Sequence, residues 1–185
     1  MSVKKFEEKT IGTDIIFEGK VIQLQVDGVE LPDGKQAKRE IIKHPGAVAI
    51  LALTNEGKIV LVEQYRKALE RSIVEIPAGK LEKGEGPEAT ARRELEEETG
   101  YVCQNMKLLQ SFYTSPGFAD EIVYLYIAEG LTQKEERLMP DEDEFVELME
   151  VTLEEAEKLL EDQRIWDAKT AYAIQYLQLQ KALTE

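Results

Sequence analysis

Three glutamates near the middle of the chain are the residues whose type and spacing could do chemistry. The stretch GKLEKGEGPEATARRELEEETGY, residues 79–101, places Glu94, Glu97 and Glu98 shortly before Gly100. A helix turns by about 100° per residue, so the three carboxylates fall within an arc of about 100° on one helix face. Hard cations such as Mg²⁺ or Mn²⁺ prefer carboxylate oxygens and bridge them to substrate phosphates. The pattern therefore predicts a metal site that acts on phosphates.

Local stability does not explain this crowding of negative charge. Like charges three or four residues apart on a helix repel each other by a few tenths of a kcal/mol per pair. These glutamates also lie near the carboxyl end of the expected helix, where the helix dipole disfavours anions. The alternative interpretation is a solvated acidic face, which is what most charge runs on helices are. A bound divalent cation would instead relieve the repulsion.

The elements around the glutamates are marked in the sequence. Pro87 suits the first turn of a helix, and Gly100 is typical of the position just after a helix end. Ala91 and Leu95 point in a neighbouring direction, where they can pack on a sheet. Glu85 lies where a carboxylate near the start of a helix is favoured, as a helix cap.

The rest of the chain alternates between strand and helix patterns. Residues 10–43 alternate apolar and polar positions and break at LPDG, residues 31–34, which indicates a small antiparallel meander. The apolar runs 47–54 and 58–65, joined by NEG, predict a hairpin covered on both faces. Strands are expected near 102–112, 121–128 and 145–151, and helices over 152–163 and 167–183.

This order of elements predicts an α+β fold, a sandwich with helices on a mixed sheet, plus the small N-terminal meander. Thr152 followed by Glu155 resembles a capping box, and Asp167 can cap the last helix. We expect two domains, residues 1–45 and residues 46–185.

Composition restricts the function. The formal charge of -14 and the pI near 4.7 argue against a protein that grips nucleic acid through phosphates. No apolar run approaches the length of a membrane span, and the N-terminus lacks the apolar core of a signal peptide, so a cytoplasmic location is expected. The lone Cys103 and the lone His44 exclude an intrachain disulfide and zinc sites built on Cys and His. Any metal must be held by oxygen.

The spacing around the glutamates resembles a known family. Gly79, five residues, Glu85, seven residues and then RELEEETGY match the box of the Nudix hydrolases at every defined position. The resemblance implies a Nudix-type α/β/α sandwich and hydrolysis of a nucleoside diphosphate linked to another group, with divalent metals held on the box. It also implies that Glu94, Glu97 and Glu98 bind metal, that the carbonyl of Ala78 adds a ligand, and that Arg93 orients the carboxylates.

A second motif narrows the resemblance. Pro116 follows the final Tyr101 of the box by fifteen residues, in SFYTSPGFADE, and this is similar to the ADP-ribose pyrophosphatase subfamily. REIIKHPGAVAIL, EQYR, EIPAGKLEKGE and AYAIQYLQLQ are also similar to that subfamily, over about residues 10 to 183. Ser-Pro-Gly is also a good turn sequence in any protein. Relatives that cleave GDP-sugars share much of the pattern, so GDP-mannose stays an alternative substrate, and a silent nucleotide sensor stays an alternative function.

The same resemblance implies further substrate-binding residues. Arg39 and Arg66 would meet the nucleotide and its phosphates, Pro116 and Gly117 would form the substrate-side turn, and Glu121 would receive the terminal ribose hydroxyls. Arginine binds phosphate through two hydrogen bonds, and a carboxylate accepts bonds from neighbouring hydroxyls. Surface ion pairs are the alternative interpretation of these charges.

The general base is expected outside the metal ligands. Bound metals can lower the pKa of the attacking water, and a carboxylate within hydrogen-bond reach would still assist the proton transfer. Coordinated carboxylates have their lone pairs committed, so this base should come from elsewhere. The acidic loop 139–147 supplies such groups, and the resemblance implies that Glu142 is the base, with Glu144 as the alternative.

In the subfamily the N-terminal meander helps build a two-fold dimer, so a homodimer is expected.

Overall fold

The computed structural model describes residues 5–134 and 145–184, in two compact units. The first unit comprises residues 1–46 with Tyr113–Ile122, and the second comprises Ala47–Phe112 with Val123–Glu185. Glu142 and Glu144 lie outside the described residues. Within the described residues no helix is long and apolar enough to cross a membrane.

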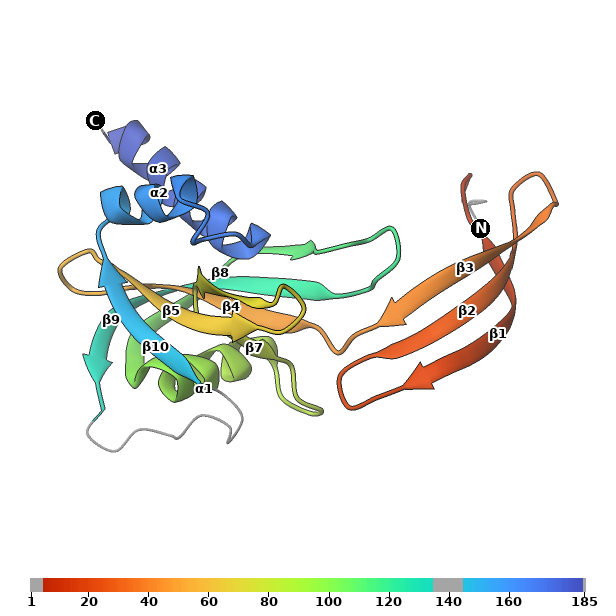
Figure 1. Cartoon of the computed structure of the whole chain (residues 1–185), viewed down its shortest axis with the longest axis horizontal. Helices are drawn as coiled ribbons and strands as arrows, with labels where there is room; N and C mark the ends of the chain where they lie inside the picture. Colours follow the sequence, from red (N-terminus) through yellow and green to blue (C-terminus); the bar gives the residue numbers. More distant parts are fainter. Residues whose placement is uncertain (1–4, 135–144, 185) are drawn as a thin grey trace. The chain divides into compact units, whose positions relative to one another are not determined.

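The first unit holds a three-stranded antiparallel sheet (Figure 1). Its strands are β1 (Lys9–Glu18), β2 (Gln23–Glu30) and β3 (Gln36–Lys43), in the order β1-β2-β3. The turn between β2 and β3 is closed by hydrogen bonds from Gly34 N to Leu31 O and from Leu31 N to Lys35 O. Gly34 has a φ of 82°, a left-handed conformation that glycine adopts without strain. The predicted meander is confirmed.

The segment Tyr113–Ile122 also belongs to the first unit, which the sequence did not predict. Ile42 N donates to Phe118 O, and Asp120 N donates to Ile42 O. The Asp120 side chain accepts a further bond of 2.8 Å from the backbone N–H of His44. These bonds join the SPGF turn to the end of β3.

The second unit is built on a seven-stranded mixed sheet. Its central path is β10-β5-β4-β9-β8, and β6 pairs with β5 while β7 pairs with β4. β4 and β9 run parallel, whereas the pairs of β5 with β4, β6 and β10 are antiparallel. The bounds are β4 (Ala47–Leu53), β5 (Ile59–Arg66), β6 (Arg71–Glu75), β7 (Ala78–Lys80), β8 (Tyr101–Tyr113), β9 (Ile122–Gln133) and β10 (Val146–Val151).

One edge of β4 is shared by two strands. Ala52 and Leu53 pair with β5, whereas residues 47–49 pair with β7. Between the two stretches Ile50 N donates to Pro77 O at 2.8 Å. β5 and β7 therefore pair with different parts of β4. The chain that follows β7 leads into the helix that carries Glu94, Glu97 and Glu98. The sequence did not predict β6 and β7, because short strands carry little periodicity.

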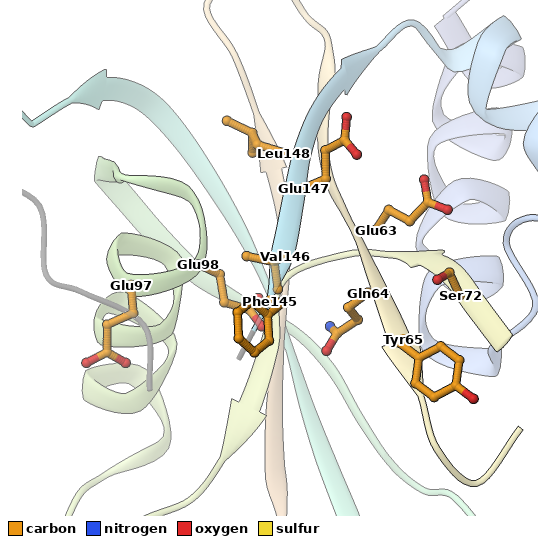
Figure 2. A pocket seen from close by; sticks show the side chains of 10 residues that line it. All are labelled: Glu63, Gln64, Tyr65, Ser72, Glu97, Glu98, Phe145, Val146, Glu147 and Leu148. Atoms are coloured by element: carbon orange, nitrogen blue, oxygen red, sulfur yellow. The ribbon is translucent and has the colours of Figure 1, made fainter. Parts of the chain in front are cut away.

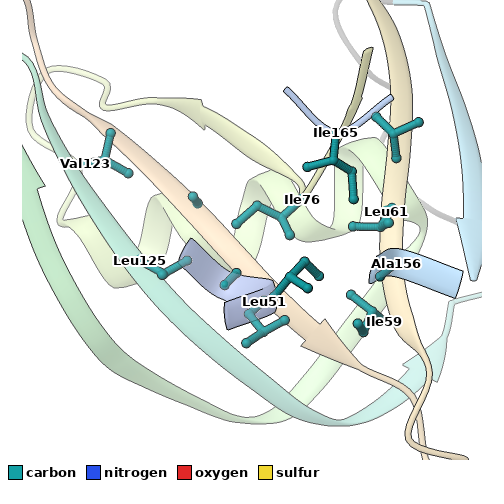
Figure 3. Packing of buried hydrophobic residues seen from close by; sticks show 12 residues of the cluster. Leu51, Ile59, Leu61, Ile76, Val123, Leu125, Ala156 and Ile165 are labelled. Carbon is teal, nitrogen blue, oxygen red and sulfur yellow. The ribbon is translucent and has the colours of Figure 1, made fainter. Parts of the chain in front are cut away.

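Helices cover both faces of this sheet. Alternating residues of β4 divide between two cores: Val48 and Ile50 pack with Ala91 and Leu95 of α1 (Pro87–Thr99). On the other face Leu51 packs in a core, drawn in Figure 3, that includes residues of α2 (Leu153–Glu161) and α3 (Ala168–Thr184). The second unit is therefore an α/β/α sandwich with a mixed sheet, as predicted.

The helix ends follow their sequence signals. Pro87 stands in the first turn of α1, and Gly100 ends the helix with a φ of 74°, donating its N–H to Glu96 O. Thr152 and Glu155 form the capping box of α2. Asp167 Oδ1 accepts a bond from Thr170 N at the start of α3. The capping role considered for Glu85 is not observed, because Gly86 is the N-cap of α1 and supplies no side-chain bond.

Candidate active site

The three glutamates of α1 lie on the half-buried side of the helix. The residues Glu94 and Glu98 are only 8% and 4% exposed, although both carry ionisable carboxylates. Ala91 and Leu95 on the neighbouring face are fully buried against the sheet, which holds the helix in place. The fourth acidic side chain, Glu96, forms an ion pair of 2.7 Å with Lys134. Glu96 is therefore paired with a lysine, whereas Glu94 contacts Arg93 and Glu98 contacts β7.

Arg93 holds the carboxylates around it. Its Nη1 donates to Glu94 Oε1 at 2.9 Å and to Glu97 Oε2 at 2.6 Å. Its Nη2 and Nε donate to Glu85 Oε2 at 3.1 and 3.4 Å. The same Glu85 oxygen accepts a bond from Thr90 Oγ1 at 2.9 Å. One guanidinium thus contacts three carboxylates, and the orienting role expected for Arg93 stays a prediction.

The charges of this cluster change the acidity of its members. The hydrogen bond from Arg93 lowers the pKa of Glu85 below its usual value, against the opposing effect of burial. Burial alone would lower the pKa of Arg93, but the bond to Glu85 and the charges of Glu94 and Glu97 raise that pKa instead. The Glu85 carboxylate therefore stays ionised, and the Arg93 guanidinium stays charged, at neutral pH.

β7 contacts the same carboxylates through its backbone. Ala78 N donates to Glu98 Oε2 at 3.0 Å. At Gly79 any Cβ would lie 1.9 Å from Glu94 Cδ, so the carboxylate occupies the space that a side chain would need. Strand β7, which contains both Ala78 and Gly79, therefore contacts Glu98 and Glu94. The carbonyl of Ala78 belongs to the same short strand.

An open cavity of ≈ 770 Å³ lies beside these glutamates (Figure 2). Glu97 and Glu98 come from α1, and the other lining residues come from β5, β6, β10 and the residue before β10. The full set is Glu63, Gln64, Tyr65, Ser72, Glu97, Glu98, Phe145, Val146, Glu147 and Leu148. The cavity is large enough for a nucleotide-sized ligand.

The donor chemistry of the cluster suits a hard divalent cation. Arg93 contacts the carboxylates of Glu85, Glu94 and Glu97, and Glu98 accepts a bond from Ala78 N beside them. The cluster therefore has surplus negative charge and carboxylate oxygens that could bind a cation. In residues 5–134 and 145–184 no three His, Cys, Asp or Glu side chains already form a group that could hold a metal ion. Arg93 Nη1 instead supplies the positive charge between Glu94 and Glu97. Metal binding by Ala78, Glu94, Glu97 and Glu98 stays a prediction.

Arg66 lies at the end of β5 in the same unit and is held by a buried carboxylate. Its Nε donates to Glu75 Oε2 at 2.6 Å, and Glu75 is only 3% exposed. Lys169 of α3 binds the other Glu75 oxygen at 2.7 Å. Neither Glu75 nor Lys169 is predicted as a site residue from the sequence pattern, although a glutamate in a buried strand is itself a signal for a charged partner.

The other expected substrate residues lie in the first unit. Arg39 forms a two-point ion pair with Glu8, at 2.8 and 2.6 Å. Pro116 and Gly117 form a turn in which Phe118 N and Ala119 N donate to Ser115 O. Glu121 accepts a bond of 2.6 Å from Thr114 Oγ1, and its other oxygen lies 3.7 Å from His44 Nδ1. Pro116, Gly117 and Glu121 thus all lie in the segment Tyr113–Ile122, which belongs to the first unit.

The second unit is an α/β/α sandwich in which Gly79, Arg93 and the clustered glutamates lie on or beside one helix, α1. This fold and this set of residues together define a protein class. The chain belongs to the NUDIX family, since the model of the NUDIX domain matches residues 43–173. The matched region includes the whole box and the sheet that positions it.

Individual relatives extend this similarity to almost the whole chain. An ADP-ribose pyrophosphatase of Bacillus subtilis (strain 168) is 66% identical over 181 residues, 98% of each chain. A methanol dehydrogenase activator of Bacillus methanolicus is 66% identical over 180 residues, 97% of each chain. A GDP-mannose pyrophosphatase of Yersinia pestis (strain Pestoides F) is 36% identical over 141 residues, 72% of this chain and 71% of the relative.

The fold is also that of a solved structure described as an ADP compounds hydrolase. The TM-score is 0.82, over 96% of this chain and 95% of the solved one, at 20% sequence identity. At that identity the likeness concerns the fold.

Proposed function

We propose that the chain hydrolyses the pyrophosphate bond of ADP-ribose to give AMP and ribose 5-phosphate. One observation carries the proposal: the similarity to the ADP-ribose pyrophosphatase of Bacillus subtilis spans 98% of both chains at 66% identity. The complete box with its arginine and glutamates supports an active enzyme rather than a silent sensor.

The carboxylates of α1 and the strand β7 would hold the cofactor, Mg²⁺ with Mn²⁺ as the alternative. The proposed ligands are the side chains of Glu94, Glu97 and Glu98 and the carbonyl of Ala78. When bound, the cation would offset phosphate charge and acidify water. Arg93 would orient the carboxylates, as its bonds to Glu94 and Glu97 support.

We propose that the substrate is bound by Arg39, Arg66, Pro116, Gly117 and Glu121. For Arg66 this is supported by the bonds to Glu75, which fix the direction of the guanidinium before a phosphate arrives. For Glu121 the support is its bond from Thr114, which leaves the second carboxylate oxygen for another donor such as a ribose hydroxyl.

We propose that Glu142 takes the proton of the attacking water, with Glu144 as the alternative base. The water oxygen bonds to phosphorus, the bond from phosphorus to the bridging oxygen breaks, and the proton passes to the carboxylate. Neither residue lies within the described part of the chain, so this role rests on the sequence pattern.

A homodimer is proposed on the basis of the first unit. β1 carries several large apolar side chains that are exposed in the single chain, among them Ile15 at 59%, Ile16 at 59% and Phe17 at 54%. A second copy that covers this strand would remove that surface from water. The division into domains at residue 45 and the cytoplasmic location stay predictions.

A second candidate function comes from the relative of equal identity. The methanol dehydrogenase activator of Bacillus methanolicus is also 66% identical, over 97% of both chains. We propose that the chain also stimulates an alcohol dehydrogenase of that kind. Adding purified wild-type protein and its Glu98→Gln variant to such a dehydrogenase tests this: stimulation by the wild type alone would link the effect to hydrolysis.

A substrate panel tests the main proposal. ADP-ribose, GDP-mannose, NADH and diadenosine compounds are each incubated with the protein and Mg²⁺, and kcat/KM is measured. We expect ADP-ribose to be the best substrate. A preference for GDP-mannose would favour the activity named for the relative with 36% identity.

A further inference from the structure

Gln64 is a polar side chain of the second unit that the proposed chemistry does not yet use. It lies on β5, where it pairs with Val146 of β10 on one side and Ile73 of β6 on the other. It also lines the ≈ 770 Å³ cavity together with Glu97 and Glu98, and Figure 2 shows its amide among the lining side chains. Gln64 thus lines the same cavity as two of the proposed metal-binding carboxylates.

The amide nitrogen of Gln64 has an unmet hydrogen-bonding capacity. Its Nε2 is buried from water and has no hydrogen-bond partner in the described residues. A buried donor without an acceptor costs free energy, and in folded proteins such groups are rare. A bound ligand with an acceptor oxygen would satisfy it.

The position of Gln64 makes a purely structural role a poor explanation. Val60 lies on the same face of β5 and fills the core beneath α1. An apolar side chain at position 64 would extend that core without burying a hydrogen-bond donor that has no acceptor. A glutamine can instead turn its amide into the cavity by rotating its side chain, and Nε2 gives up no hydrogen bond when it does so.

The neutrality of Gln64 fits a place beside acidic residues. A lysine or arginine at this position would pair with the glutamates, as Arg93 already does with Glu94 and Glu97. An amide donates a hydrogen bond without competing with a cation for those carboxylates. The geometry therefore favours an acceptor brought by the substrate.

We propose that Gln64 is a substrate-binding residue whose Nε2 donates a hydrogen bond to a phosphate oxygen of the pyrophosphate. This inference rests on the proposed function and adds a residue to that site. The bond joins a neutral donor to an anionic oxygen, and such bonds are stronger than neutral ones.

The test compares Gln64→Met and Gln64→Glu with the wild type in the presence of Mg²⁺. Methionine keeps the length of the side chain and removes the donor, so kcat/KM for ADP-ribose is expected to fall about 10-fold or more. Glutamate keeps the shape but places a negative charge against the phosphate, so a larger loss is expected. Affinity for Mn²⁺ alone should stay unchanged in Gln64→Met, because the amide is not a metal ligand.

Thermal unfolding separates substrate binding from a structural role. Gln64→Met removes an unsatisfied donor, so its Tm should equal or exceed that of the wild type. Gln178→Met is the matched control, because Gln178 Nε2 on α3 has a partner, Glu157, at 3.0 Å. That variant should keep its kcat/KM and lose some Tm.

Each outcome decides a distinct question. Wild-type kcat/KM in Gln64→Met overturns the assignment of Gln64 and leaves the proposed function intact. A Tm loss large enough to explain the fall in kcat/KM by unfolding has the same consequence. A wild-type protein that hydrolyses no ADP-ribose overturns the proposed function and this inference with it. Reduced kcat/KM with an unchanged Tm and unchanged Mn²⁺ affinity supports both.

Discussion

The carboxylate of Glu94 occupies the space that a side chain at residue 79 would fill. A Cβ on Gly79 would lie 1.9 Å from Glu94 Cδ and 2.1 Å from Glu94 Oε1, which is closer than any non-bonded contact allows. The glycine at the start of the box is therefore required by the glutamate that follows fifteen residues later. A side chain at residue 79 would force this carboxylate to move.

Gly79→Ala should damage the metal site more than the fold. The added methyl group must displace the Glu94 carboxylate, so we expect affinity for Mn²⁺ to fall about 10-fold or more, with a stability loss of about 1–3 kcal/mol. Gly86→Ala is the control, because a Cβ there meets nothing within 4 Å. Titration of Mn²⁺ and thermal unfolding check both. Equal Mn²⁺ affinity in the two variants would contradict the role given to Glu94.

Glu98→Gln should remove catalysis and leave the protein folded. The amide oxygen of glutamine can still accept the 3.0 Å bond from Ala78 N, so the link to β7 survives. A neutral amide is a weaker cation ligand than a carboxylate, and we expect kcat for ADP-ribose to fall about 10²-fold or more. Steady-state kinetics and circular dichroism provide the measurement. A folded variant with near-native turnover would refute metal binding by Glu98.

Tyr101 should make stability depend on pH under alkaline conditions. Its hydroxyl donates to Glu150 at 2.5 Å, and this bond, with burial, raises the pKa of Tyr101 from 10.0 to about 12. The stabilising effect is complete below pH 10 and is lost as the pH rises toward 12, because there only the unfolded state has released the proton.

Denaturant titrations across that window check the prediction. The free energy of unfolding should fall more steeply with pH for the wild type than for Tyr101→Phe. Glu150→Gln is the second arm, since it removes the charge that raises the tyrosine pKa. Parallel pH profiles for the wild type and Tyr101→Phe would show that the bond does not persist in solution.

The identity of the base is tested by substitution in the acidic loop. We expect Glu142→Gln to lower kcat about 10²-fold or more, the range typical of acid–base groups, with little change in KM. Glu144→Gln is the comparison, and loss in that variant alone would shift the assignment by two residues. If both variants keep wild-type kcat, no loop carboxylate takes the proton.

Local signals in the sequence predicted much of the second unit. Pro87 and Gly100 bound α1, and Thr152 with Glu155 marked the start of α2, because helix ends depend on residues close in sequence. The mixed sheet and its two covered faces followed from apolar runs of strand length.

Contacts between distant segments were harder to predict. The pairing of Ile42 with the segment around Phe118 and the burial of Glu75 between Arg66 and Lys169 join residues far apart in the chain. Strand β7 is too short to show periodicity, yet it positions Glu98 and Glu94. The box identified the chemical groups, whereas the distances between them depend on tertiary packing.

The most direct test of the account is product analysis after incubation with ADP-ribose. With Mg²⁺ present, chromatography should show AMP and ribose 5-phosphate in equal amounts. Chelation of the metal should abolish both products, because the proposed ligands on α1 would act through a bound cation. Hydrolysis that continues at full rate without metal, or intact ADP-ribose in the presence of Mg²⁺, would contradict the proposed function.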